Sequence, residues 1–100
     1  MVYGKIGSFD KAIEQFNKTI DIKPDSSLAY SNRGLAYSLL GEPDKALKDL
    51  NKALEIDNSN TEAYGTRGNL YLRTGRKELA VSDFRKACDL GDNKGCDVLK

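Results

Sequence analysis

The chain has 100 residues, which is enough for one domain and too few for two. Sixteen Lys and Arg residues against fifteen Asp and Glu residues give a net charge of +1, without the basic excess of nucleic-acid-binding proteins, so we expect neither nucleic acid nor an anionic membrane surface as a partner. No apolar run approaches the roughly 20 residues that span a bilayer, and the absence of His removes the commonest general base and metal ligand.

The first predicted helix covers about residues 9–22. It carries apolar residues at three- and four-residue steps, at Ile13, Phe16 and Ile20. Only about Met1 to Ile6 remain before it, which is too little chain to cover its apolar face. We therefore expect these three side chains to be partly uncovered.

Residues 27–60 predict a pair of helices. The first runs from Ser27 to Leu40 and ends at Gly41, because glycine adopts the left-handed cap conformation at little cost. Pro43 suits the first turn of the second helix. The apolar stripe of that helix then follows three- and four-residue steps at Ala46, Leu47, Leu50, Ala53 and Leu54.

Residues 61–94 repeat this pattern with a helix at 61–74, a glycine at 75 and a helix at 77–90. Shifting the sequence by 34 residues aligns Tyr30 with Tyr64, Gly34 with Gly68, Gly41 with Gly75 and Ala46 with Ala80. A fixed internal period of this length is typical of a solenoid. Gly34 and Ala46, like Gly68 and Ala80, are predicted to lie where paired helices cross, because small side chains allow close approach.

The spacing of these residues resembles the tetratricopeptide repeat (TPR). The motif is Tyr30-x2-Arg33-Gly34-x2-Tyr37 followed by Ala46-x3-Leu50, and it recurs from Tyr64 to Phe84. The resemblance implies an all-α fold, an α-α superhelix (solenoid) of antiparallel helix hairpins. Residues 1–26 are then a truncated first unit, 27–60 and 61–94 are complete units, and 95–100 begin a capping helix.

The incomplete first unit suggests self-association as a function. A solenoid unit does not bury its apolar face alone, and its terminal units need polar caps. The register places Met1 one residue beyond the position of Gly34 and Gly68 in the later units, so the chain starts partway through a helix. A self-associating structural fragment without its own ligand is therefore an alternative hypothesis, with a second copy of the chain covering this end.

The chain contains two cysteines, Cys88 and Cys96. The segment from Lys86 to Cys96 resembles part of Sel1-like and cysteine-rich bacterial repeats, in which paired cysteines staple one helix to the start of the next. Such a bridge would stabilise the fold by roughly 2–3 kcal/mol and would indicate a periplasmic or secreted protein. Two reduced, packed thiols in a cytoplasmic protein are the alternative.

No residue pattern predicts an enzyme or a cofactor. The acidic pairs Asp44 with Asp49 and Glu78 with Asp83 lie among lysines on the second helices, where we expect solvated side chains. Cys88 has no His partner, and two cysteines without His make a poor zinc site. We therefore expect neither catalytic residues nor a metal.

The first helix of each pair is expected to line the concave side of the solenoid. Its exposed positions differ most between the two complete units, while the packing positions agree. The resemblance implies that this face binds a peptide or a partner protein, with Asn32 holding the ligand backbone. The predicted partner-binding residues are Leu28, Ser31, Asn32, Leu35, Leu39, Glu62, Thr66, Asn69 and Arg73.

The family's carboxylate-binding clamp is not predicted in this chain. Glu62 and Thr66 stand at two positions where such clamps carry Lys or Arg, and the first unit lacks most of its first helix. We instead expect weak binding of an extended or helical segment with mixed polar and apolar side chains.

Overall fold

The computed structural model describes the backbone of residues 2–99 and the side chains of residues 8–99. The described chain contains helices and turns, without β-strands. The helices are α1 (Val2–Ile22), α2 (Ser27–Leu39), α3 (Pro43–Ile56), α4 (Thr61–Arg73), α5 (Lys77–Asp89) and α6 (Asn93–Val98).

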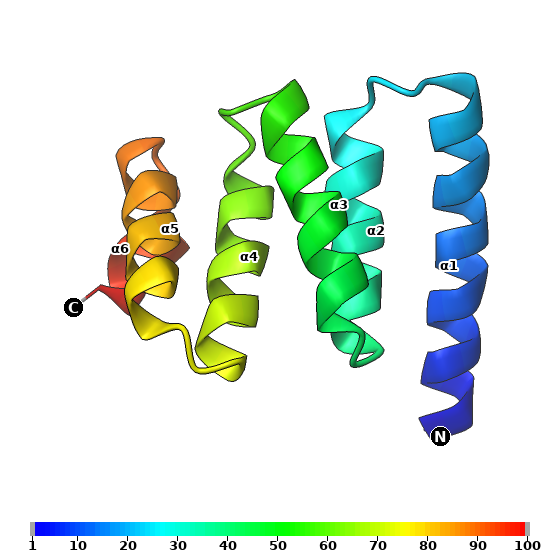
Figure 1. Ribbon diagram of the computed structural model, residues 1–100, viewed down its shortest axis with the longest axis horizontal. Helices are drawn as coiled ribbons and strands as arrows, with labels where there is room; N and C mark the ends of the chain where they lie inside the picture. The colour runs from blue at the N-terminus through cyan, green and yellow to red at the C-terminus, as the bar shows by residue number, and fades with distance from the viewer. Residues whose placement is uncertain (1, 100) are drawn as a thin grey trace.

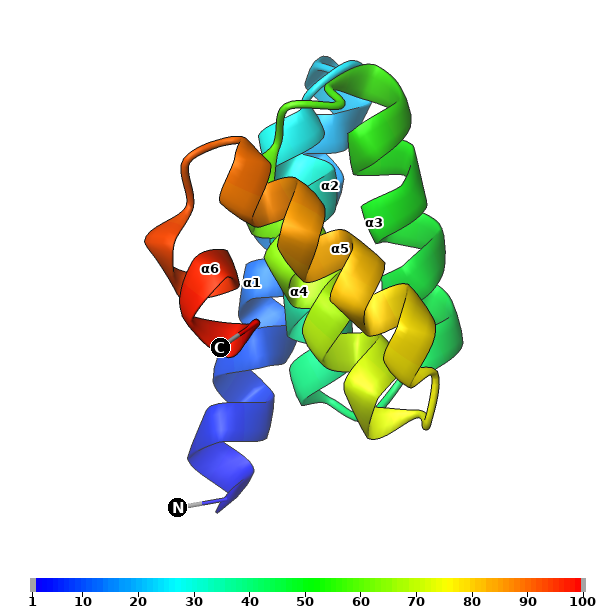
Figure 2. The same cartoon turned by 90° about the vertical axis from the view of Figure 1, so that its left-hand side faces the viewer.

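The helices follow one another across the molecule in chain order, from α1 at one end to α5 and α6 at the other (Figure 1). The most extensive contacts lie within two antiparallel hairpins, α2 with α3 and α4 with α5. In the view of Figure 2, α6 and α3 lie on opposite sides of the molecule. The predicted solenoid of antiparallel helix hairpins is confirmed.

Glycine ends the first helix of both hairpins, as predicted. Gly41 has φ +79° and Gly75 has φ +81°, in the left-handed region that residues with a Cβ rarely adopt. The reversal lets the Glu42 amide donate to the Tyr37 carbonyl at 2.9 Å, and the Arg76 amide donate to the Tyr71 carbonyl at 2.7 Å. These bonds satisfy carbonyls that the end of a helix leaves without a partner.

Asn60 is the N-cap of α4 and also ties that helix to the preceding hairpin. Its side-chain oxygen accepts from the Ala63 amide at 3.1 Å, and its amide nitrogen donates to the Ser27 hydroxyl at 2.9 Å. Ser27 in turn donates to the Ala53 carbonyl of α3 at 2.8 Å. One turn side chain therefore links the start of α4 to both α2 and α3.

Close approach between paired helices depends on glycine. A Cβ on Gly34 would lie 2.9 Å from Cγ of Leu50 and 3.2 Å from the Ala46 carbonyl oxygen. The predicted crossing of Gly34 and Ala46 is therefore present, and Leu50 is fully buried beside it. On Gly68 a Cβ would meet the ring of Phe84 at 2.9 Å, so the nearest side chain there is Phe84 rather than Ala80.

The expectation that Asp49 is solvated is wrong. Asp49 is buried and accepts two hydrogen bonds from Arg33, from Nε at 2.8 Å and from Nη2 at 2.8 Å. Arg33 also donates from Nη1 to Asn17 of α1 at 2.8 Å. This network therefore joins both helices of one hairpin to the helix before it, and the pairing keeps a buried charge from being isolated.

The next hairpin repeats the network, so the expectation for Asp83 is also wrong. Arg67 donates to the buried Asp83 at 2.8 Å and 2.7 Å and to Asn51 of α3 at 2.8 Å. The hydrogen bond to Asp83 raises the pKa of Arg67, as the bond to Asp49 raises that of Arg33. A raised arginine pKa adds stability that is present below the unfolded-state pKa and is lost only at strongly alkaline pH.

The two terminal helices differ from their predicted bounds. The helix expected at about 9–22 extends to Val2 and passes through Gly7, which stands in register with the turn glycines 41 and 75. Ile13 is 9% exposed, so the expectation that it is uncovered is wrong, whereas Phe16 and Ile20 are half-buried. Met1, on which the expected start within a helix rests, lies outside the described residues. At the other end, α6 begins at Asn93, two residues before the predicted capping helix.

Candidate functional site

A groove runs along α2 and α4, and α6 forms part of its wall. It consists of a larger hollow of about 600 Å³ and a smaller one of about 330 Å³. The two hollows adjoin because Leu35, Thr66 and Asn69 line both. We call the combined surface the concave groove. It includes eight of the nine predicted partner-binding residues, namely Ser31, Asn32, Leu35, Leu39, Glu62, Thr66, Asn69 and Arg73.

Leu28 is the predicted residue that does not line the groove. It lies in the first turn of α2, and its side chain is 61% exposed. Helical spacing places Leu28 on the same face of α2 as Asn32. Spacing alone does not show that the hollow between α2 and α4 ends before it reaches Leu28.

The smaller hollow has an apolar floor. Leu35, Leu39 and Leu72 line it and are 42%, 53% and 45% exposed. Clustered leucines that remain this accessible are typical of a protein-contact surface. This hollow therefore suits an apolar side chain of a ligand.

Arg73 stands at the rim of the smaller hollow and is already engaged within the chain. Its Nη2 donates to the hydroxyl of Ser38 and lies 3.3 Å from the Ser38 carbonyl oxygen. The contact links α4 to α2 across the groove. Arg73 remains exposed, so it is accessible to a ligand although it is not a free cation.

The larger hollow contains polar side chains and charges of both signs. Asn32 and Asn69 supply amide groups that donate and accept hydrogen bonds. Glu62 and Lys94 are exposed, and neither belongs to an ion pair among the described residues. This part of the groove offers hydrogen-bonding and charged side chains that the fold itself does not use.

The contribution of α6 and α5 to the groove is not among the sequence-based predictions. Phe84 of α5 and Asp92, Lys94, Gly95 and Val98 line the larger hollow. A signal was present, because Asp92 caps α6 just as Asn60 caps α4 and Ser26 caps α2. The short helix thus begins with a cap like those of α2 and α4 and, like them, lines the concave side. Val98 is 52% exposed and forms part of the groove surface.

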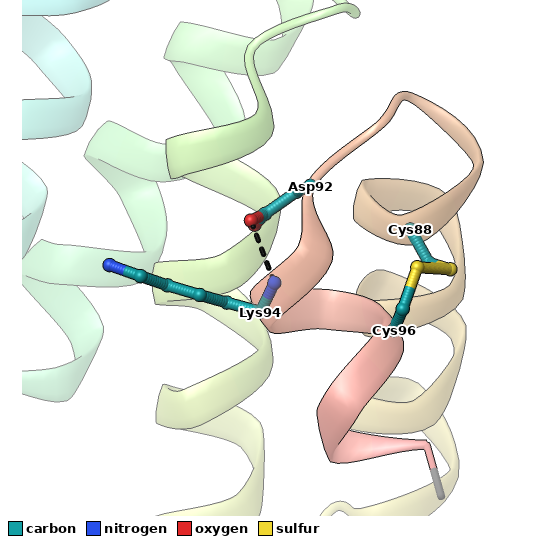
Figure 3. The surroundings of a disulfide bond; sticks show 4 residues. All are labelled: Cys88, Asp92, Lys94 and Cys96. Carbon is teal, nitrogen blue, oxygen red and sulfur yellow. Dashed lines mark hydrogen bonds between the residues drawn. A yellow bond between two sulfur atoms is a disulfide. The ribbon is translucent and has the colours of Figure 1, made fainter.

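A disulfide joins Cys88 of α5 to Cys96 of α6, with the two Cα atoms 4.6 Å apart (Figure 3). Both cysteines are half-buried. Figure 3 shows the bond on one side of α6, with the side chain of Lys94 extending away from it. The bridge therefore links α6, which forms part of the groove wall, to α5.

Within residues that the structure describes, no cluster of His, Cys, Asp and Glu has the composition of a metal site. The same residues include no helix with the length and apolar character needed to cross a bilayer.

Stacked helix hairpins with an open concave groove define an α-solenoid. Sequence models of the repeat families called "tetratricopeptide repeat" and "TPR repeat" match residues 2–41, 27–60 and 61–91. A search of curated protein sequences found no match. The chain belongs to the tetratricopeptide repeat family, whose members are protein-interaction modules and typically not enzymes.

Solved structures support this assignment. The TPR domain of Arabidopsis OM64 is 31% identical, with 92% of this chain and 77% of that chain covered and a TM-score of 0.85. The first TPR of Spaghetti (RPAP3), bound to the HSP90 peptide SRMEEVD, is 28% identical over 97% of this chain and 84% of that chain, with a TM-score of 0.81. YrrB, a TPR protein with an unusual peptide-binding site, is 33% identical over 79% and 41%, with a TM-score of 0.77.

Proposed function

We propose that the chain binds a segment of a partner protein in the concave groove. The observation that carries the proposal is the groove itself, a continuous hollow along α2 and α4 that holds amides, unpaired charges and exposed leucines. Similar TPR structures with bound peptides, such as that of Spaghetti (RPAP3), support a peptide as the ligand.

The side chains of the groove indicate a ligand of mixed character. The apolar floor around Leu35 and Leu39 accommodates one apolar side chain, and Asn32 and Asn69 are placed to bond the ligand backbone or its polar side chains. Binding is expected to be weak because the groove is open. Its polar groups lose bound water when the ligand enters, but the ligand encloses them only in part, so that the cost of removing the water is not fully offset. We do not propose capture of an acidic C-terminus such as that of SRMEEVD, because Glu62 and Thr66 occupy positions where a carboxylate clamp carries basic residues.

The test is a binding measurement with a peptide selected on the protein from a random library and labelled with fluorescein. Asn32→Ala and Arg73→Ala should each weaken binding about fivefold to tenfold, since each removes about one hydrogen bond to the ligand. Lys48→Ala is the matched control, because Lys48 is exposed on α3 and lies outside the groove. Unchanged affinity in both groove variants would remove the groove as the binding site.

The alternative function, self-association through the first unit, predicts a different result. The mass measured by light scattering would then rise with protein concentration, and substitutions on α1 would prevent the rise. A monomer at high concentration would count against self-association and leave the groove proposal intact.

A further inference from the structure

The groove wall formed by α6 has little packing to hold it in place. The helix has six residues, whereas isolated helices shorter than about 12 residues are marginal in water. Its contacts are chiefly with α5, and Gly95 is its only buried residue. The buried apolar core of the described residues lies entirely between Ile13 and Ala87. No side chain of α6 belongs to this core, and α6 meets it through the backbone at Gly95, beside Phe84 and Ala87.

Two features place α6 against α5. A Cβ on Gly95 would lie 2.8 Å from the Phe84 carbonyl oxygen and 3.0 Å from the Cys88 amide nitrogen, so the backbones of the two helices touch at this point. One residue later, Cys96 forms the disulfide to Cys88 (Figure 3). The covalent bond thus fixes the contact that the glycine permits.

The same helix supplies four residues to the larger hollow, Asp92, Lys94, Gly95 and Val98. Lys94 is the only cation among the described residues that line that hollow, and its side chain extends away from the disulfide (Figure 3). The position of α6 consequently determines both one wall of the larger hollow and the positive charge of that hollow.

We infer that the Cys88–Cys96 disulfide regulates ligand binding, because it holds α6 in place as a wall of the concave groove. The inference rests on the proposed function of the groove. In the oxidised protein the wall is complete and the ligand meets Lys94 and Val98. In the reduced protein α6 detaches from α5, this wall of the larger hollow is lost, and affinity falls about tenfold, the equivalent of losing one or two well-placed ligand contacts.

The chemical step is thiol–disulfide exchange with a dithiol. A thiolate of the dithiol attacks one sulfur of the bridge and forms a mixed disulfide, and the other cysteine leaves as a thiolate that takes up a proton. The second thiol of the reductant then resolves the mixed disulfide. Cys88 and Cys96 together gain two electrons and two protons, and the dithiol becomes a disulfide. Because both cysteines are half-buried rather than enclosed, the bridge is accessible to a small reductant.

The experiment uses the selected fluorescein-labelled peptide and the whole chain, oxidised or treated with dithiothreitol. The peptide should bind the reduced protein about tenfold more weakly. A Cys88→Ser/Cys96→Ser variant should show the weaker affinity with or without dithiothreitol. Asn69→Ala is the control for the site, because Asn69 lies on α4 and should contribute in both redox states. Equal affinity in the oxidised and reduced proteins, with Asn69→Ala still weakening binding, would overturn the inference and leave the proposed function standing.

Hydrogen exchange provides a readout that needs no ligand. The amides of residues 93–99 should lose protection on reduction, whereas those of α2 to α5 should keep it. Circular dichroism should accordingly show that most of the helix content survives. Unchanged protection of residues 93–99 after complete reduction, measured by thiol titration, would show that α6 stays in place without the bond and would also overturn the inference.

Discussion

In the unit at residues 27–60, Gly34 lies against Leu50, and in the unit at residues 61–94, Gly68 lies against Phe84. The buried ion pairs of the two units match in the same way, since Arg33 holds Asp49 and Arg67 holds Asp83 with nearly equal distances. Each arginine also reaches an asparagine of the preceding helix. Where the helices pack, the two units are therefore close copies of each other.

The groove faces of the same two units are different. Thirty-four residues apart, Asn32 is replaced by Thr66, Leu35 by Asn69 and Leu39 by Arg73. All of these side chains line the concave groove. Helix packing therefore restricts the positions between paired helices to a few types of side chain. The groove positions are not restricted in this way, so their chemistry can be matched to a ligand.

The largest expected effect comes from the packed side of this comparison. Leu50→Ala should lower the free energy of unfolding by about 2–5 kcal/mol, because it leaves a cavity at a fully buried site. Leu28→Ala, at a side chain that is 61% exposed, should change it by less than about 0.5 kcal/mol. Urea unfolding followed by circular dichroism measures both. Similar losses in the two variants would show that the first hairpin is not packed as described.

The ion pairs come next in size. Arg67→Met should destabilise the protein by about 2–3 kcal/mol, because it leaves Asp83 buried without its partner; the partial exposure of Arg67, 21%, keeps the loss below that of a fully enclosed pair. Adding Asp83→Leu should recover most of the loss. Arg33→Met and Asp49→Leu should behave alike if the two units are true copies. A double variant no more stable than Arg67→Met would contradict this account.

Two glycines on α4 should respond in opposite directions. Gly68→Ala should cost about 1–3 kcal/mol, because the new Cβ would meet the Phe84 ring at 2.9 Å. Gly65→Ala faces open space in the groove and should stabilise the helix by about 0.5–1 kcal/mol. Thermal unfolding of the two variants side by side measures the difference. Stabilisation by Gly68→Ala would show that the helices of this hairpin do not approach closely.

The smallest effect on stability is expected at the groove charges. Glu62→Gln and Lys94→Gln should each change the free energy of unfolding by less than about 0.5 kcal/mol, since neither residue is in an ion pair among the described residues. Peptides selected on the two variants should nevertheless differ in charge from those selected on the unaltered protein. Identical selected peptides would show that these charges do not face the ligand.

Local sequence signals were sufficient for much of the fold. Gly41 and Gly75 predicted the ends of α2 and α4, and the small side chains predicted the crossing of Gly34 and Ala46. Gly7 occupies the same register without ending α1, because glycine permits a left-handed turn and does not compel one. A structure was needed to show that the helix continues.

Other features depend on contacts that a local pattern does not show. Asp49 and Asp83 were expected to be solvated because lysines flank them in the sequence, but their partners lie sixteen residues away on the paired helix. The role of α6 in the groove was missed for another reason. Asp92 follows Asn60 by 32 positions rather than 34. Because α6 is therefore out of register with α2 and α4, the sequence predicted only a capping helix there.

The central claim, that the concave groove binds the ligand, is tested most directly by NMR. The selected peptide would be titrated into ¹⁵N-labelled oxidised protein and the amide shifts mapped on the sequence. We predict shifts of amides along α2, α4 and α6, including those of Asn32, Asn69 and Lys94. Little change is expected at Lys48 on α3 and Arg85 on α5. Shifts concentrated on α3 and α5, with α2 and α4 unaffected, would contradict the account.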